Sequence, residues 1–435
     1  MADSANDLAD HSGDLGDCDR ATRPGDREQS DHVPVDQPLV EIGIIVAGSL
    51  DPVDEPAVKQ ATRQFIEFVQ QTFPDFRWHL VESRRPEAIT GQITGQRIAP
   101  SSLLQQALEE RDEQHWDFAF VLTPSELESH YSTHCFAALS RPLNAAAFSL
   151  SLIDPRAIGR TGHADQRIAT IANRLSRLML HALGHLLGLS RADLADNLLY
   201  HPASAKQLDS MQQLDESQIA KLQTALYEIA DQRLEEAPGR RLAALPFIAQ
   251  SAWINRREIA QAIVAARPWQ FPQRLSGLTL ASVSTLAVLL MTAESWDLAL
   301  SQPGMNLVAL AVLSWIITTA YVIVRQQLIV RDQPLRSEQI VVTTFAAIGI
   351  VFTGMLVAWM FLMFLASSIA WLMFRADLIA AWASSSSFST GQIGLSERLQ
   401  MATFASSLGL MIGSLGTSFE AQHYFRHVIF VDEEI

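Results

Sequence analysis

Two histidines four residues apart are the residues of this chain best suited to chemistry. His181 and His185 lie in the run His-Ala-Leu-Gly-His-Leu-Leu-Gly-Leu. Residues at i and i+4 share one face of a helix, so both imidazoles can reach one metal ion. Spacing alone is weak evidence, because His130 and His134 repeat it elsewhere. We interpret that second pair as ordinary loop or helix residues.

The residues around His181 and His185 make the pattern more specific. Gly188 follows the second histidine by three positions, and Asn-Leu-Leu-Tyr ends at Tyr200. This outline resembles the metzincin zinc peptidases, whose pattern is His-Glu-x-x-His-x-x-Gly-x-x-His followed by a turn that contains Met. It is similar to the matrixin and archaemetzincin branches, and the resemblance covers roughly residues 38–215.

The resemblance implies a zinc ion held by three imidazoles, a bound water as nucleophile, and a Glu that accepts the proton of that water. In this chain Ala182 stands at the Glu position, Arg191 at the third His and Leu199 at the Met. Ala182 cannot accept a proton, and losing a positioned general base typically costs about 10²–10⁴ in rate. Arg191 is a permanent cation that would repel Zn²⁺ if it pointed inward. The sequence therefore predicts no catalytic residue.

The predicted metal ligands are His181, His185 and Asp193, and His201 is a further candidate for the third position. A pair of histidines without a third ligand holds zinc poorly, so we expect zinc to be absent or weakly bound. The plain alternative is a packed, hydrogen-bonded pair in an inherited fold. In that interpretation Gly184 allows close packing of the helix, and the helix ends at a glycine in the left-handed conformation.

The elements that must position these residues alternate between strands and helices, which predicts an α/β domain. Short β-rich runs predict strands, and apolar residues at helical spacing predict helices, with one helix carrying both histidines. The predicted strands are 40–46, 77–81, 117–123 and 145–152. The predicted helices are 56–72, 103–108, 166–188 and 215–236, the last ended by Pro238-Gly239.

The last third of the chain has the composition of membrane helices. Uncharged apolar stretches of roughly spanning length predict three spans and a weaker fourth candidate. These are Leu275–Met291, Met305–Val324, Ile340–Phe374 and, as the fourth, Met401–Leu415. The expected fold class is a metzincin-like α/β soluble domain plus an all-α transmembrane domain. The expected division is a disordered acidic tail (1–37), the metzincin-like domain (38–214), a helical linker (215–272) and a transmembrane domain with three or four helices (273–435).

The distribution of charged residues along the sequence indicates which partners are excluded and how the chain is oriented in a membrane. The formal net charge is −15, and residues 1–36 carry ten acidic side chains against three arginines. No basic stripe occurs, which argues against nucleic acid as a partner. Arginines precede the first predicted span and follow the second, while residues 292–304 contain no Lys or Arg. The positive-inside rule then predicts a multi-pass protein of the cell membrane with its N-terminal domain in the cytoplasm.

Three functions fit these observations. The first is an integral membrane protein whose cytoplasmic metzincin-like domain is catalytically inactive and binds a peptide or protein partner. The alternative is a membrane-anchored zinc metallopeptidase with a non-standard base and third ligand. The third is a function of the spans, with the metzincin-like part as a regulatory domain. The first three predicted spans contain no charged residue, which argues against a pump or coupled transporter.

Overall fold

The computed structural model describes residues 37–85, 97–159, 163–230, 244–328, 338–383, 393–417 and 422–435. From Pro38 onward the chain forms one unit. The predicted acidic tail, apart from Gln37, and the predicted helix end at Pro238-Gly239 lie outside the described residues.

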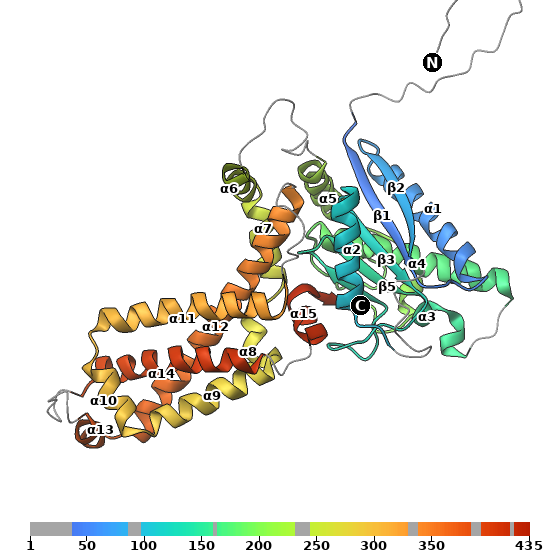
Figure 1. Ribbon diagram of the computed structural model, residues 1–435. Helices are drawn as coiled ribbons and strands as arrows, with labels where there is room; N and C mark the ends of the chain where they lie inside the picture. The colour runs from blue at the N-terminus through green and yellow to red at the C-terminus, as the bar shows by residue number, and fades with distance from the viewer. Residues whose placement is uncertain are drawn as a thin grey trace, which may run out of the picture. The chain divides into compact units, whose positions relative to one another are not determined.

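A six-stranded sheet is the centre of the first half of this unit (Figure 1). Its order is β2-β1-β3-β5-β4-β6, in which β1, β2, β3 and β5 are parallel, while β4 runs antiparallel to both β5 and β6. The strands are β1 Leu39–Ala47, β2 Arg77–Arg85, β3 Phe118–Thr123, β4 Ala137–Ser140, β5 Ala145–Ser149 and β6 Glu433–Glu434. The last strand comes from the far end of the sequence and pairs with β4.

Alternation along the strands divides the core into two layers. On β3, Phe118 and Phe120 pack with α1 (Asp54–Thr72) and α4 (Ala164–Leu186), whereas Ala119 and Val121 pack on the side of α2 (Pro100–Gln114). Short helical segments follow β5 and α4: α3 Leu150–Ile153, η1 Pro155–Ile158 and η2 Gln207–Asp209. The predicted strands and the histidine-bearing helix are confirmed, although β5 ends at Ser149, where α3 begins.

The second half of the unit is helical. Its elements are α5 Glu216–Ile229, α6 Ala244–Ile254, α7 Arg256–Ala265, η3 Pro268–Gln270, α8 Phe271–Arg274, α9 Ser276–Leu290, α10 Ala293–Ser301, α11 Gly304–Arg325, α12 Glu338–Met373, α13 Ala376–Trp382, α14 Leu395–Gly416 and α15 Gln422–Phe430. Three of the described helices, α11, α12 and α14, are long and apolar enough to cross a membrane. Residues 256–274 and α9 would make a fourth if this pair, bent by 53°, is one span.

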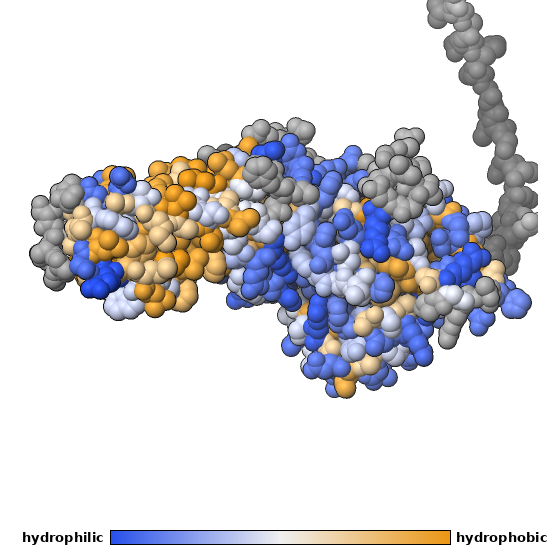
Figure 2. All heavy atoms as spheres, turned by 90° about the horizontal axis from the view of Figure 1, so that it is seen from below, coloured by the Kyte–Doolittle hydropathy of each residue, from blue (hydrophilic) through white to orange (hydrophobic). Residues whose placement is uncertain are grey.

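Apolar side chains cover the outside of this helical part, in contrast to the polar surface of the sheet domain (Figure 2). Leu280, Met305 and Phe364 are each more than two-thirds exposed. Inside, Arg398 of α14 donates hydrogen bonds to the carbonyls of Ala370 and Phe374 at the end of α12. Ala370 lies in the last turn of α12 and Phe374 directly follows the helix, where carbonyls typically lack a partner within the helix, so the buried guanidinium supplies donors there.

Polar contacts connect the sheet domain with the helices that follow it. The Gln339 side chain donates to the carbonyl of Trp116 at 3.0 Å. At the loop between β4 and β5, the Arg141 guanidinium donates to Gln261 Oε1 at 2.5 Å, and the Asn144 amide donates to Glu258 Oε1 at 3.4 Å. These contacts place α7 beside the loop that follows β4.

Candidate functional site

Helix α4 places both histidines of the predicted site under the edge of the sheet. His181 is buried, and its Nδ1 donates a hydrogen bond to the Leu198 carbonyl at 2.8 Å. That partner fixes the tautomer, because a carbonyl only accepts, and it leaves Nε2 with a lone pair. Burial lowers the pKa of His181 to about 4, which outweighs the opposing effect of Glu433, so the ring is neutral at pH 7.

His185 lies between two carboxylates that sequence reasoning did not find. Its Nε2 is 2.9 Å from Asp432 Oδ2, and its Nδ1 is 2.6 Å from Glu433 Oε2. Both carboxylates can only accept, so both nitrogens carry hydrogen and the ring is cationic. Burial acts to lower the pKa of His185, but the pairs with Asp432 and Glu433 outweigh it and raise this pKa to about 10.

Glu433 is the centre of the cluster. Its side chain is 3% exposed, and it accepts from Arg191 Nε in addition to His185. His201 Nδ1 and His181 Nε2 lie 3.5 and 4.0 Å from the same Oε1 atom. Burial acts to raise the pKa of Glu433, but its contacts with the His185 and His201 rings outweigh it and hold this pKa far below its usual range. We call His181, His185, Arg191 and His201 the basic cluster.

Glu434 binds a separate set of donors on the other side of the segment. Its Oε atoms accept from the backbone amides of His130 and Tyr131 at 3.0 and 2.9 Å, and from Ser129 Oγ at 3.0 Å. His427 Nε2 of α15 is 2.7 Å away. Burial acts to raise the pKa of Glu434, but these hydrogen bonds lower it to about 2. We call Ser129, His130, Tyr131 and His427 the amide receiver.

Backbone pairing holds the acidic residues in register. Residues 431–435, here called the acidic segment, lie antiparallel to β4 with Glu433 opposite Leu139 and Glu434 opposite Ala138. The Ile435 amide donates to the Ala137 carbonyl at 2.8 Å, and the Phe136 amide donates to the Ile435 carbonyl at 2.5 Å. An extended segment added to a sheet edge is a common way for a domain to bind a peptide.

The three positions that depart from the zinc-peptidase pattern have different surroundings. Ala182 is fully buried in the core between α4 and the sheet. Arg191 is half exposed and points at Glu433. Leu199 packs against Gly184, where a Cβ atom would lie 2.7 Å from Leu199 Cδ2, so the predicted close packing at Gly184 is confirmed. Gly188 has a φ of 91°, which confirms the left-handed helix end.

Asp193, the predicted third ligand, is exposed on the turn after α4. Within the described ranges, it has no hydrogen bond or ion pair with His181 or His185. Its role as a ligand stays a prediction. His201, the further candidate, belongs to the basic cluster. His130 lies in the amide receiver, with its ring centroid 4.5 Å from that of His427, whereas His134 is exposed.

The arrangement with Glu433 in place does not fit a zinc ion. Both nitrogens of His185 face carboxylates, and a fixed guanidinium charge lies against the carboxylate at the centre. Zinc needs neutral imidazole lone pairs, and a cation beside the metal opposes its binding. No set of three His, Cys, Asp or Glu side chains among the described residues forms a metal site.

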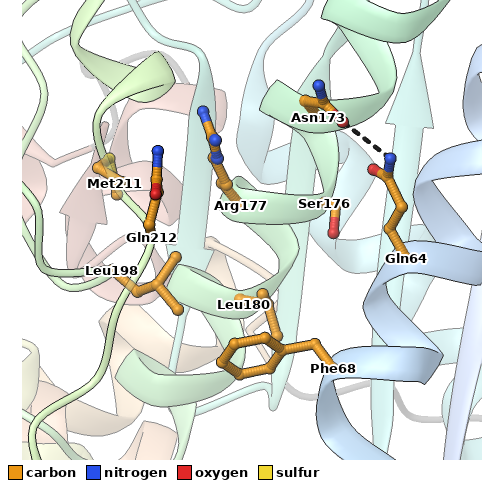
Figure 3. A pocket seen from close by; sticks show the side chains of 9 residues that line it. All are labelled: Gln64, Phe68, Asn173, Ser176, Arg177, Leu180, Leu198, Met211 and Gln212. Carbon is orange, nitrogen blue, oxygen red and sulfur yellow. Dashed lines mark hydrogen bonds between the residues drawn. The ribbon is translucent and has the colours of Figure 1, made fainter.

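Two hollows border this region. One of about 220 Å³ lies along the acidic segment, and its lining includes Arg191, Arg267 and Arg274. The other, of about 340 Å³, lies between α1 and α4, where Gln64 donates to Asn173 at 2.8 Å (Figure 3). Leu198 lines this second hollow and also gives its carbonyl to His181. The first hollow, with its three guanidinium groups, is the one that faces the acidic residues.

No protein-family profile and no curated protein match this sequence. Among solved structures, an archaemetzincin from Methanopyrus kandleri is 18% identical with a TM-score of 0.35, over 45% of this chain and 98% of that one. A zinc-dependent peptidase from Methanocorpusculum labreanum is 13% identical with a TM-score of 0.31, over 41% of this chain and 99% of that one. An archaemetzincin from Archaeoglobus fulgidus, complexed with malonate, is 11% identical with a TM-score of 0.31, over 42% of this chain and 99% of that one.

Proposed function

We propose that this chain is a multi-pass membrane protein whose sheet domain binds an extended peptide of a partner and does not hydrolyse it. The observation that carries the proposal is the acidic segment itself, paired along the edge of β4 with its Glu433 carboxylate inside the basic cluster. A cleft that holds a peptide in this way has the shape and the hydrogen-bonding edge needed for a binding module.

The chemistry of the cluster supports binding over hydrolysis. Ala182 offers no proton acceptor at the position next to the first histidine. The nearby carboxylates Asp432 and Glu433 are both paired with His185, and the low pKa of Glu433 makes it a poor general base. In the proposed cleft, the charged groups of the basic cluster therefore bind a carboxylate and do not activate water.

The helical part supports a location at the membrane. The apolar helices α11, α12 and α14 are the proposed spans, with α9, the uncharged arm of the bent pair, as a fourth. Arginines at 256, 257, 267 and 274 precede α9, and the 292–304 stretch has no Lys or Arg. By the positive-inside rule, the sheet domain faces the cytoplasm and meets its peptide or protein partner there.

A hydrolysis assay tests the proposal. The purified full chain in detergent is incubated with a mixed peptide library, with and without a chelator, and the products are read by mass spectrometry. We expect no cleavage above that of a His181→Ala variant. Chelator-sensitive cleavage that this variant lacks would contradict the proposal.

One observation favours the alternative, a zinc metallopeptidase with a non-standard base and third ligand. His181, His185 and His201 all lie within 4.0 Å of Glu433, so three imidazoles surround one point. If the acidic segment left the cleft, these three rings would be the ligands for the metal. Cleavage that appears only in a chain without the acidic segment, and that needs zinc, would favour this function.

A further inference from the structure

We infer that the β4 edge selects extended peptides with consecutive acidic residues between apolar ones, and that residues 431–435 of this chain occupy that site from within. This inference rests on the proposed peptide-binding function and names its ligand class. The ligand is recognised by its chemistry: an apolar–acid–acid–acid–apolar strand, as in Val-Asp-Glu-Glu-Ile.

Backbone pairing supplies the part of the affinity that does not depend on sequence. The carbonyls of Ala137 and Leu139 accept from the amides of Ile435 and Asp432, at 2.8 and 3.2 Å. The Phe136 amide donates in return to the Ile435 carbonyl. Any extended chain could make these bonds, so selectivity must come from the side chains.

The basic cluster and the amide receiver bind the side chains of two consecutive acidic residues. Successive side chains of a strand point to opposite sides. Glu433 accordingly enters the basic cluster, and Glu434 enters the amide receiver. Both carboxylates are 3% exposed or less. A buried receiver made of N–H groups and cations leaves its donors without partners when the ligand carries no carboxylate.

Further positive charge lies beside the segment without acidic partners. Arg267 and Arg274 line the hollow of about 220 Å³ that also contains Asp432 and Glu434. Throughout the part of the chain that the structure describes, neither arginine forms an ion pair with an acidic side chain, and the Arg274 guanidinium stacks at 4.2 Å on the Tyr131 ring. This positive hollow favours the approach of an acidic strand.

Attachment to the same chain gives the acidic segment an advantage over a free peptide. It directly follows α15, whose His427 belongs to the amide receiver. A tethered ligand acts at an effective concentration that can reach millimolar, so a free peptide of the same sequence competes poorly. Weakening the tethered segment alone should therefore expose the site to a free peptide.

The test measures binding of a fluorescent peptide, His-Val-Ile-Phe-Val-Asp-Glu-Glu-Ile, to the full chain in detergent by polarisation. A second peptide carries Asn-Gln-Gln in place of Asp-Glu-Glu. We expect Glu433→Gln in the protein to strengthen binding of the acidic peptide about tenfold or more, and the amide peptide to bind that variant about tenfold more weakly or worse. An Asp377→Asn variant, which removes an exposed carboxylate of α13, should behave as wild type.

Equal binding of the two peptides would overturn the acidic selectivity while leaving the proposed peptide binding in place. Absence of binding to a folded Glu433→Gln chain would overturn the inference, whereas peptide cleavage would overturn the proposed function instead. If that variant does not fold, hydrogen exchange on wild type decides. Saturating acidic peptide should speed exchange in residues 431–435 while 136–139 stay protected, and unchanged exchange would overturn the inference.

Discussion

Replacing Glu434 by Gln should release the acidic segment from β4 without unfolding the sheet. The carboxylate accepts from two backbone amides and from Ser129, His427 Nε2 lies 2.7 Å from it, and its side chain is 1% exposed. A pKa lowered from 4.5 to about 2 corresponds to roughly 3 kcal/mol of preference for the charged form. The amide oxygen of Gln keeps part of this stabilisation, because it can still accept hydrogen bonds. The substitution is therefore expected to destabilise the pairing of the acidic segment with β4 by about 1.5–3 kcal/mol.

Hydrogen exchange of the full chain in detergent measures this cost locally. The amides of Ile435 and Phe136 donate across the β4–β6 pair, so their exchange reports the opening of the segment. A cost of about 1.5–3 kcal/mol predicts exchange that is about tenfold to 100-fold faster in Glu434→Gln. The amides of β3 should keep their wild-type protection.

The matched control is Glu397→Gln, which also removes a carboxylate that accepts from a backbone amide, that of Gly394 at 2.7 Å. It lies at the start of α14 and should leave exchange at Ile435 unchanged. The lowered pKa of Glu434 also predicts how its stabilising contribution changes with pH. The Glu434 contribution is complete above pH 4.5 and is lost as pH falls toward 2. Exchange in Glu434→Gln within threefold of wild type would refute the reasoning.

Three further changes have defined outcomes. The pKa of His185 is raised to about 10, so its contribution to holding the segment is present below pH 6.5 and lost as pH rises toward 10. Exchange at residues 431–435, corrected for intrinsic rates, should therefore rise over that range in wild type, and a His185→Gln chain should show no such rise. Gly184→Ala puts a Cβ atom 2.7 Å from Leu199 Cδ2 and should lower the free energy of unfolding by about 1–3 kcal/mol in denaturant titration. Adding Leu199→Ala should remove that clash. A double variant whose loss of unfolding free energy equals the sum of the two single losses would contradict this explanation. Arg398→Met leaves the carbonyls at the end of α12 without their buried donor and should lower the melting temperature in detergent, whereas the exposed Arg375→Met should not.

Much of the sheet domain could be predicted because its elements are locally encoded. β1 and β3 are mostly apolar runs, in which Glu41 is the one charged residue, and α4 shows helical spacing with both histidines on one face. The apolar stretches that became α11 and α12 were equally clear, whereas the stretch that became α14 was the weaker fourth candidate. The first predicted span differs: α9 has only 15 residues and reaches spanning length only together with residues 256–274, across the 53° bend.

The occupant of the candidate site could not be predicted in the same way. β6 is two acidic residues long, and such residues are depleted in strands. Its pairing with β4 joins positions almost 300 residues apart, which no local pattern encodes. The one signal available was the placement of three acidic residues between Val431 and Ile435, directly after an apolar run. The prediction for Arg191 was likewise incomplete: its repulsion of a metal ion was predicted, but its pairing with the Glu433 carboxylate was not.

Zinc stoichiometry of the full chain tests most directly the claim that the basic cluster holds a carboxylate. The purified protein is dialysed, given one equivalent of zinc, desalted and measured by elemental analysis beside a His181→Ala/His185→Ala control. We predict zinc well below one per chain, equal in both proteins, because Glu433 and Arg191 occupy the place of a metal. One zinc per wild-type chain, lost in the control, would contradict the account and support a metallopeptidase.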